Sequence, residues 1–402
     1  MTERTELQAF VVDLGVALYR HGATTPRVEE ALERLASRFG IDGQFFLTPT
    51  ALFASFGPGG GSTHLVRLQG AIVDLDRLAG LDALLVGLLQ GRIPPAQAGE
   101  QLRSILVAPA AHRWRATEIL ASVGACAAAG RLVGGGWREV VVSGIIGLLC
   151  EVLAGFSARS MRLQRLQTMI AGFVAGLLAT AATTLVAPFQ PQLAMIAGLV
   201  IVLPGLTLTT AITELAMGHL VSGTTRFSSA AIVFLTLAFG VALGSHLAGA
   251  SFGPAPSQAP AGLSGWTLGV ALLVAPVAIA RLFRAPRSEV AFVVLGSLVA
   301  YGGAAFGQHL LGVQLGVLLG GFAAGAAANG YARLRNRPAA IVYLPALLLL
   351  VPGIIGFRSV TALLARDVTS GIDIAFTTLL MAASLVTGML LAAVVVPPRR
   401  VL

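Results

Sequence analysis

Long apolar stretches alternate with short polar segments from residue 113 to the end of the chain. Each stretch is close to the roughly 20 residues that a helix needs to cross the hydrocarbon core of a bilayer. The pattern predicts about ten transmembrane helices of this length. The first five are expected at residues 117–136, 138–158, 166–187, 192–212 and 226–249, and the second five at residues 265–284, 287–306, 310–331, 339–356 and 374–396.

The first 112 residues show a different pattern, which predicts an α/β domain. Apolar positions recur at helical spacing from Leu7 to Tyr19. Thr25 is the expected N-cap of a second helix, with Pro26 at its first position and Gly40 just beyond its end. Two strands and two further amphipathic helices complete the expected domain, at residues 44–56, 64–68, 74–89 and 94–106.

Two of the expected membrane helices are interrupted by a Pro-Gly pair, at Pro204-Gly205 and at Pro352-Gly353. Proline removes a backbone donor and glycine weakens a helix, so each pair leaves backbone groups without partners. At membrane depth such groups persist only inside protein or beside a water-filled cavity. Paired breaks of this kind are typical of the solute site of a secondary transporter.

The two breaks also mark an internal repeat. They lie 352 − 204 = 148 residues apart, and Gly223 and Gly371 have the same separation. A shift of 148 residues brings the first five expected helices close to the second five. Because five is odd, the second copy enters the membrane in the opposite sense, as in inverted-repeat transporters. The expected fold class is a polytopic α-helical membrane protein with ten transmembrane helices as two five-helix inverted repeats, preceded by an N-terminal cytoplasmic α/β domain. The expected domain boundaries are 1–112, 113–250 and 251–402.

Polar side chains near the breaks are candidate solute ligands. Helical spacing puts Thr207, Thr210 and Glu214 on one face, which offers hydroxyls and one titratable acid to a small zwitterionic or carboxylate solute. Arg358 could bind a solute carboxylate through two hydrogen bonds. The alternatives are a Glu214 exposed to water on an interfacial helix and an Arg358 that only anchors its helix at the interface. The predicted substrate-binding residues are Pro204, Gly205, Thr207, Thr210, Glu214, Pro352, Gly353 and Arg358.

Glu151 is a carboxylate inside the second expected membrane helix. A charged side chain at membrane depth costs roughly 3 kcal/mol on insertion scales, so such a residue is by default a functional one. Glu151 and Glu214 are therefore the predicted proton-coupling residues. The alternative for Glu151 is a side chain that extends to the inner membrane face near Arg159.

Composition and charge support a membrane protein. The chain is 56% hydrophobic and 11% charged, whereas a soluble domain is usually about 25% charged. The net charge of +9 comes from Arg, without any Lys, and the Arg residues sit in clusters between apolar stretches. This pattern sets membrane orientation and argues against nucleic-acid binding. It predicts a cytoplasmic N-terminus, with clusters on the inner face at residues 113–115, 159–165, 226, 281–287, 333–337 and 399–400.

Motifs of other functional classes are absent from the sequence. The first residues lack the basic and apolar regions of a cleavable signal peptide. Cys126 and Cys150 both lie in apolar stretches, and the pattern indicates no disulfide framework, metal site or cofactor. No HExxH or GxSxG motif is present, which argues against a membrane hydrolase. An N-terminal enzyme or sensor domain anchored by the spans, with His21 and Thr25 among its candidates, and a passive channel remain as hypotheses.

The segments HGATTPRVEEALERLASRFGI and FFLTPTALFASF resemble the cytoplasmic domain of the threonine/serine exporter family. VPGIIGFRS, from Val351 to Ser359, resembles the family's second membrane module. Glu214 stands where the family more often has Asp. The positions that match the family's PG-to-Arg motif are Pro204, Gly205, Glu214, Gly218, His219, Gly223 and Arg226.

The resemblance covers essentially the whole chain and implies a non-enzymatic exporter in a bacterial inner membrane. Its solute would be threonine, serine or a related small amino acid, and export would be coupled to protons. A sister arrangement with the two modules on separate subunits exports succinate, so a small dicarboxylate is the alternative solute. The implied partners are the solute, protons and the lipid bilayer, and a homo-oligomer stays open.

Overall fold

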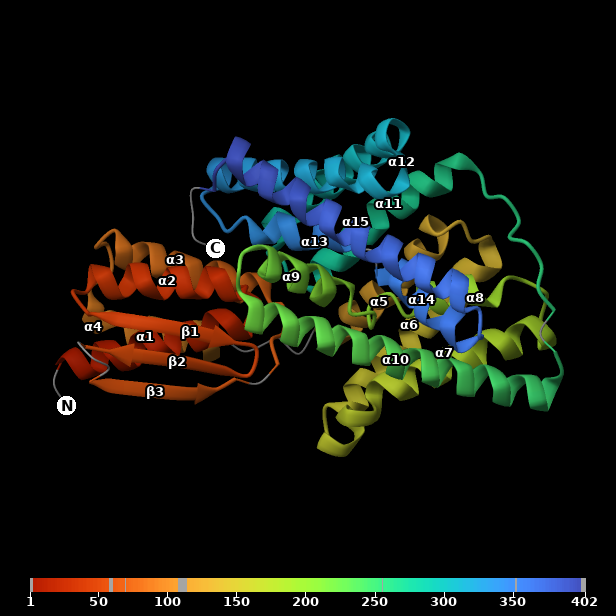
Figure 1. The fold of residues 1–402 in the computed structure, drawn as a ribbon, viewed down its shortest axis with the longest axis horizontal. Helices are drawn as coiled ribbons and strands as arrows, with labels where there is room; N and C mark the ends of the chain where they lie inside the picture. The colour runs from red at the N-terminus through yellow and green to blue at the C-terminus, as the bar shows by residue number, and fades with distance from the viewer. Residues whose placement is uncertain are drawn as a thin grey trace.

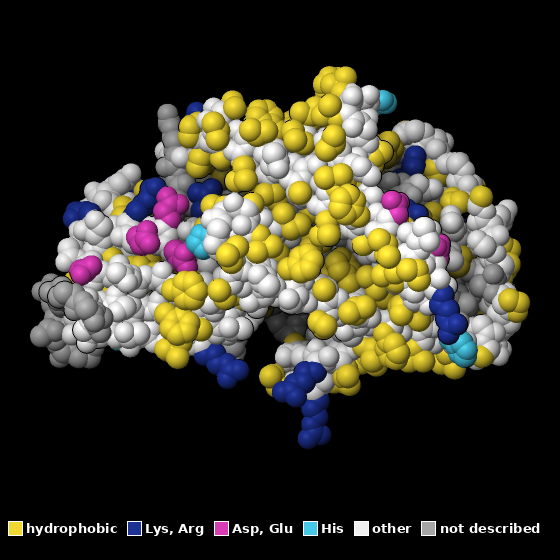
Figure 2. All heavy atoms as spheres, viewed as in Figure 1, with side chains coloured by type: hydrophobic (Ala, Val, Ile, Leu, Met, Phe, Trp, Pro, Cys, Tyr) yellow, Lys and Arg dark blue, Asp and Glu magenta, His cyan; other side chains and the backbone are white. Residues whose placement is uncertain are grey.

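The computed structural model describes residues 3–57, 61–68, 70–107, 114–254, 256–350 and 353–398. It consists of an N-terminal domain and a larger, entirely helical part, which lie side by side (Figure 1). Hydrophobic side chains cover most of the visible surface of the helical part, whereas charged side chains gather on the N-terminal domain and at helix ends (Figure 2). This distribution is the one expected for a lipid-facing helical bundle with a polar domain attached.

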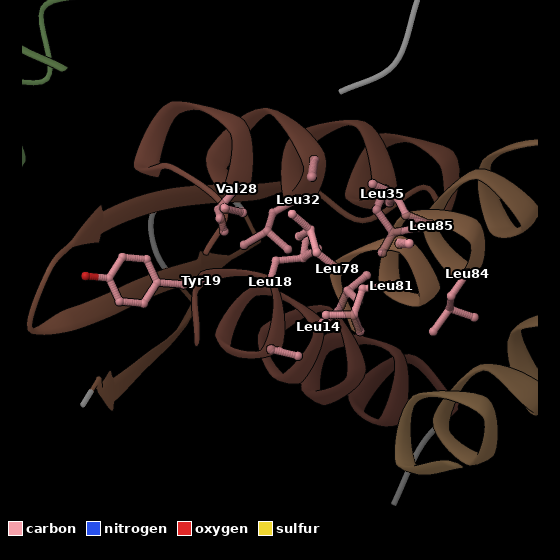
Figure 3. Packing of buried hydrophobic residues seen from close by; sticks show 14 of the residues in the cluster. Leu14, Leu18, Tyr19, Val28, Leu32, Leu35, Leu78, Leu81, Leu84 and Leu85 are labelled. Carbon is pink, nitrogen blue, oxygen red and sulfur yellow. The ribbon is translucent and has the colours of Figure 1, made fainter. Parts of the chain in front are cut away.

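The N-terminal domain packs helices against one face of a small antiparallel sheet with the strand order β1-β2-β3. Leucines from α1, α2 and α3 meet in its core, among them Leu14, Leu32 and Leu81 (Figure 3). These side chains are fully buried. The elements are α1 (Glu3–Arg20), α2 (Thr25–Arg38), β1 (Gly43–Thr48), β2 (Ala51–Phe56), β3 (Ser62–Arg67), α3 (Leu75–Leu89) and α4 (Pro95–Val107).

The predicted strand over residues 44–56 is wrong, because it is a hairpin of β1 and β2. Pro49 lacks a backbone donor and interrupts the ladder. The hydroxyl of Thr48 then closes the turn, accepting a hydrogen bond from the backbone N–H of Ala51 at 3.0 Å and donating one to its carbonyl at 3.1 Å. Three strands therefore replace the two that were expected.

Helix α2 starts one residue earlier than its sequence suggests. Thr24 is the N-cap and Thr25 is already helical, so the predicted capping by Thr25 is wrong. The buried hydroxyl of Thr25 has no hydrogen-bond partner among the described residues. The predicted end is confirmed, because Gly40 follows the helix with a φ of +64°, a conformation that favours glycine.

The helical part contains two successive groups of helices. The first comprises α5 (Trp114–Leu132), α6 (Trp137–Ser157), α7 (Met161–Leu185), α8 (Pro191–Gly198), α9 (Gly205–Ala216) and α10 (Leu220–Phe252). The second comprises α11 (Gly265–Leu282), the 3-10 turn η1 (Arg287–Glu289), α12 (Val290–Arg335), α13 (Ala340–Leu350), α14 (Gly353–Leu364) and α15 (Val368–Val395). Within the described residues, 7 helical stretches are long and apolar enough to cross a membrane. The protein is therefore a polytopic membrane protein.

Helix α12 folds back on itself at Gly312, which has a non-helical φ of +78°. A Cβ atom on Gly307 would lie 2.3 Å from the carbonyl oxygen of Gly316. In a straight helix residues nine positions apart are separated by about 13 Å along the axis. The two halves of α12 are thus an antiparallel hairpin, which agrees with two separate spans expected near residues 287–306 and 310–331.

Both predicted breaks fall between helices. Residues 199–204 are unwound, and α9 begins at Gly205, so the expected span 192–212 is two short helices. In the second group α13 ends at Leu350 and α14 begins at Gly353, while Pro352 lies outside the described residues. The fifth helix begins at Leu220 rather than at residue 226, so Arg226 is a helical residue.

Helices around the two breaks match at the predicted offset. Adding 148 to the bounds of α9 gives residues 353–364, the bounds of α14, and adding 148 to the first residue of α10 gives the first residue of α15. Helix α10 begins beside the N-terminal domain and runs away from it, whereas α15 begins beside α14 and runs back toward the domain's side (Figure 1). We call the end of the bundle next to the N-terminal domain the domain side, and the opposite end the far side.

Candidate functional site

The two breaks meet at one cavity in the helical part. Its volume is about 90 Å³, and Gly205 and Gly353 both line it. A water molecule needs only about 10–15 Å³ measured this way, so the space can hold several waters or a small solute. We call it the central cavity. Its remaining lining residues come from α5, α11 and the segments around the breaks: Ala125, Ala129, Leu132, Val200, Ile201, Leu203, Ala275, Ile279, Leu348, Leu349 and Ile354.

Backbone groups supply the polarity of the central cavity, because its side chains are aliphatic. Among the backbone hydrogen bonds of the described residues, none is accepted by the carbonyl oxygens of Val200, Ile201 or Leu203. Helices α9 and α14 both begin at this cavity, and a helix N-terminus carries a partial positive charge and unpaired N–H groups. The cavity therefore combines hydrogen-bond acceptors from unwound chain with the positive ends of two helices.

Glu151 lies on α6, half-buried, and does not line the central cavity. Its carboxylate accepts a hydrogen bond from the buried hydroxyl of Ser122 on α5 at 2.7 Å. One helical turn further along α5, the thiol of Cys126 donates to the carbonyl oxygen of Gly198 at 3.3 Å, where α8 ends and the break starts. Arg159, the partner considered for Glu151 in the alternative interpretation, stacks on the ring of Phe156.

Glu214 lies at the contact between the helical part and the N-terminal domain and is completely buried. One carboxylate oxygen accepts a hydrogen bond from the backbone N–H of Thr25, at the start of α2, at 3.3 Å. The other forms an ion pair with Arg226 of α10 at 3.0 Å. The guanidinium of Arg226 also reaches the hydroxyl of Tyr19 at 3.5 Å and lies over its ring.

A second set of contacts surrounds this ion pair. His219, between α9 and α10, lies 3.3 Å from the carboxylate of Glu29. The same carboxylate accepts a hydrogen bond from the backbone N–H of Leu47 at 2.7 Å, and the hydroxyl of Ser222 donates to the carbonyl of Leu47 at 3.0 Å. Burial raises the pKa of Glu29 and that of Tyr19. We call these eight residues the docking site: Tyr19, Thr25, Glu29, Leu47, Glu214, His219, Ser222 and Arg226.

A separate contact ties α3 of the N-terminal domain to the second group of helices. The backbone N–H of Leu75 donates to the carbonyl of Phe283 at 2.9 Å. Arg284 forms ion pairs with Asp74 at 3.3 Å and with Glu118 at 3.2 Å. The N-terminal domain is thus bound to both groups of helices at the domain side.

The structure separates the predicted site residues into three places. Gly205 and Gly353 line the central cavity, and the buried Pro204 directly precedes it as the N-cap of α9. Glu214 belongs to the docking site. Thr207, Thr210 and Arg358 line neither: the two threonines are half-buried and Arg358 is exposed. Sequence reasoning did not find the docking roles of Tyr19, Ser222 and Arg226, although His219 and Arg226 belong to the family motif.

Positions 148 residues apart match for residues that shape the bundle but not for the charged docking residues. Gly223 and its counterpart Gly371 are both buried where two helices meet, and both touch a leucine of the preceding helix. The charged docking residues are not repeated. At the same offset of 148, the positions of Glu214, His219 and Arg226 are taken by Ala362, Asp367 and Ile374. The charged docking residues therefore occur only in the group of helices where these positions contact the N-terminal domain.

Two family models, both described as threonine/serine exporter, match residues 9–248 and 269–395. This chain belongs to the threonine/serine exporter family. The family consists of membrane transporters and not of enzymes, and here both of its modules lie on one chain.

Relatives occur in bacteria and in fungi. The threonine/serine exporter of Corynebacterium glutamicum is 25% identical over 328 residues, which cover 79% of this chain and 66% of the relative. Pheromone-regulated membrane protein 10 of Debaryomyces hansenii is 26% identical over 371 residues, 89% of this chain and 36% of the relative. The protein of the same name from Saccharomyces cerevisiae is 26% identical over 370 residues, 89% of this chain and 47% of the relative. The chain thus spans about a third of the length of the first fungal relatives. No solved structure matches it.

Proposed function

We propose that the protein is a secondary active exporter of small amino acids, threonine and serine foremost, built from two inverted five-helix repeats. In this proposal the first repeat crosses the membrane with α5, α6, α7, the pair α8 and α9 together, and α10. The second repeat crosses it with α11, the first half of α12, the second half of α12, the pair α13 and α14 together, and α15. The matching bounds of α9 and α14 and the opposite directions of α10 and α15 support an inverted repeat (Figure 1). Such repeats hold the solute at their interface and expose it alternately on either side.

The domain side is the cytoplasmic side in this proposal. The Arg clusters near residues 281–287 and 333–337 lie at the ends of helices on this side, and Arg284 contacts the N-terminal domain directly. Positive residues concentrate in cytoplasmic loops. The membrane in this proposal is the inner membrane of a bacterium, and one relative is the threonine/serine exporter of the bacterium Corynebacterium glutamicum.

One observation supports this class of solute. The N-termini of α9 and α14 share the central cavity with carbonyl groups of the unwound segment that accept no backbone hydrogen bond from the described residues. Helix N-termini stabilise a carboxylate, and unwound carbonyls stabilise an ammonium group or a cation. An α-amino acid carries both groups on one carbon atom. The aliphatic walls leave room only for a small side chain, which fits threonine or serine better than a large amino acid.

Coupling to protons is assigned to Glu151, which lies among helices and is linked through α5 to the break. Protonation of this carboxylate would change its bond to Ser122 and thereby the position of α5 against Gly198. Glu214 is proposed to act from the docking site, where its ion pair must open if the domain side opens. Direct solute contact by Thr207, Thr210 or Arg358 would need a conformation in which these residues approach the central cavity.

Transport into inside-out membrane vesicles tests the proposal. Labelled threonine is added outside, and the vesicle interior is acidified, so that an exporter exchanging solute for protons accumulates the label. We expect accumulation that collapses with a protonophore and is competed by serine. Succinate is the second solute to test, because the sister two-subunit arrangement exports it. Absence of accumulation of any small amino acid or dicarboxylate would refute the exporter proposal.

A further inference from the structure

A second, larger cavity lies between α7, α8, α10 and α14. Its volume is about 460 Å³. Its walls are mostly aliphatic, but four uncharged polar side chains face it, one from each of these helices: Thr180, Gln192, Ser245 and Thr361. A few hydroxyl and amide groups in an apolar wall are the usual composition of a small-molecule site. We call this space the far cavity.

The far cavity lies at the far side of the membrane. Ser222 of α10 contacts the N-terminal domain, whereas Ser245, which lines the cavity, is 245 − 222 = 23 residues further along the same helix. At 1.5 Å per residue this separation is about 35 Å, more than the thickness of the hydrocarbon core. The rim of the cavity is exposed at Gln192 and Leu364, so the space opens outward at this end.

The repeat offers a matched comparison on the domain side. Met195 and Val241 line the far cavity, and their counterparts at an offset of 148 are Tyr343 and Met389. These two side chains are in contact, with the hydroxyl of Tyr343 3.1 Å from the sulfur of Met389. Tyr343 also packs against the hydrophobic core that includes the N-terminal domain. On the domain side, the two counterparts thus touch each other and pack toward the N-terminal domain. Such an asymmetry is expected if two inverted repeats are in an outward-open state.

Phe357 separates the two cavities. On α14, Gly353 and Ile354 line the central cavity, and Phe357 and Thr361 line the far cavity. The ring of Phe357 is completely buried in the same hydrophobic cluster as Leu199, which is also completely buried. Its counterpart in the first repeat is Thr209, a much smaller side chain. At this pair of positions, the large side chain is thus the one that lines the far cavity.

We propose that the far cavity is the outward-facing vestibule through which the solute leaves, and that Phe357 is the gate between it and the central cavity. This inference rests on the proposed exporter function and extends it with an exit route. The occupant is the transported solute, a small hydroxylated amino acid, whose hydroxyl and charged groups meet the side chains of Thr180, Gln192, Ser245 and Thr361.

Labelling of single introduced cysteines tests the vestibule in intact cells. Ser245→Cys and Thr361→Cys are treated from outside with a charged, membrane-impermeant maleimide, in the presence and absence of threonine. Cys126 and Cys150 are buried, so the unsubstituted protein gives the background. Gly262→Cys is the matched control, because it lies on the exposed loop before α11 with open space around it. We expect all three cysteines to react and threonine to slow only the two in the cavity.

The gate is tested with Ile354→Cys in the central cavity. We expect its labelling from outside to become roughly tenfold faster when Phe357 is replaced by Ala, the change that corresponds to lowering the opening barrier by about 1.4 kcal/mol. If Phe357→Ala does not fold, Phe357→Leu is used in its place. It keeps more of the packing and should give a smaller acceleration of labelling. An unchanged rate in a folded variant would overturn the gate.

Transport by the same variants separates the two proposals. If the vesicles accumulate threonine while neither cavity cysteine reacts, or both react without protection by any transported solute, the vestibule is overturned and the exporter function stands. If the cysteines react but no variant and no wild-type protein transports any small solute, the exporter function itself fails.

Discussion

At the scale of single residues, two carboxylates of the helical part, Glu214 and Glu151, have defined polar partners. Glu214 is buried against an arginine and a helix N-terminus, and Glu151 is held by a serine hydroxyl. Both are within apolar sequence, yet the first holds two domains together and the second is placed among transmembrane helices. The chemistry open to each depends on these partners.

Replacing Glu151 by Gln should abolish proton-coupled transport while the protein still folds, because Gln keeps an acceptor for Ser122 but cannot titrate. Uptake of threonine into acid-loaded inside-out vesicles measures this, and solute exchange without a proton gradient should persist. Ser122→Ala is the paired change, and loss of this hydrogen bond should destabilise the fold by about 0.5–1.5 kcal/mol. Coupled transport at the wild-type rate in Glu151→Gln would remove this residue from the mechanism.

The raised pKa of Glu29 should make the stability of the protein depend on pH. Burial raises its pKa above the ordinary 4.5, so the folded state binds this proton more tightly than the unfolded state. The resulting stabilisation is complete below about pH 4.5 and is lost as the pH rises through the raised pKa. Glu29→Gln should therefore match the wild type near pH 4 and unfold at a higher temperature at pH 8. Thermal unfolding in detergent across this range measures the difference, and a gap that does not vary with pH would contradict it.

At the scale of helices, the backbones of neighbouring helices approach most closely at glycine residues. A Cβ atom on Gly240 of α10 would lie 2.3 Å from a carbonyl oxygen of α7, and one on its counterpart Gly388 of α15 would lie 2.0 Å from a carbonyl of α12. Gly172 and Gly176 of α7 face α10 in the same way, since a Cβ atom on either would lie 2.3 Å from a carbonyl oxygen of α10. Each repeat thus uses small residues to bring its long helix against its neighbour.

Gly388→Ala should destabilise the bundle by about 1–3 kcal/mol, because the two helices must move apart to admit the methyl group. Gly330→Ala is the control on α12, where an added Cβ meets nothing. That change should stabilise the helix by about 0.5–1 kcal/mol. The two variants can be compared by thermal unfolding in detergent, and equal shifts would contradict the packing argument.

The Arg226–Glu214 pair connects two helices and should behave as a buried ion pair. Arg226→Ala leaves a buried carboxylate without its partner and should lower the free energy of unfolding by about 3–5 kcal/mol. The double variant Arg226→Ala/Glu214→Gln should recover a part of this loss. Arg34→Ala removes an exposed pair with Glu30 and should change stability by less than about 1 kcal/mol. Unfolding of the purified variants measures both. Additive effects in the double variant would show that the pair is not coupled.

At the scale of the whole molecule, the N-terminal domain covers one side of the bundle while a cavity stands open on the other. If transport needs both sides to open in turn, the docking site must release in every cycle. Holding it closed should stop transport without unfolding the protein.

Glu29→Cys with His219→Cys places two thiols at positions whose longer side chains now meet at 3.3 Å, so that a short bifunctional thiol reagent can link them. Cross-linking this pair should abolish threonine transport, and reduction should restore it. Each single variant, treated in the same way, should keep its activity. Undiminished transport by the fully cross-linked protein would show that the domain stays docked throughout the cycle.

The membrane class, the helical periods, the two breaks and their separation of 148 residues could all be predicted from the amino-acid pattern, because apolar length and Pro-Gly chemistry are local properties. Two local details differ from expectation. The N-cap of α2 is Thr24 rather than Thr25, a shift of one residue between two neighbouring threonines, and the expected strand over residues 44–56 is divided by a turn at Pro49. That Gly205 and Gly353 share a cavity and that Glu214 faces another domain became visible only in the folded molecule. Those facts depend on contacts between residues more than 100 positions apart. A local sequence pattern does not predict which distant residue will pack against a given side chain.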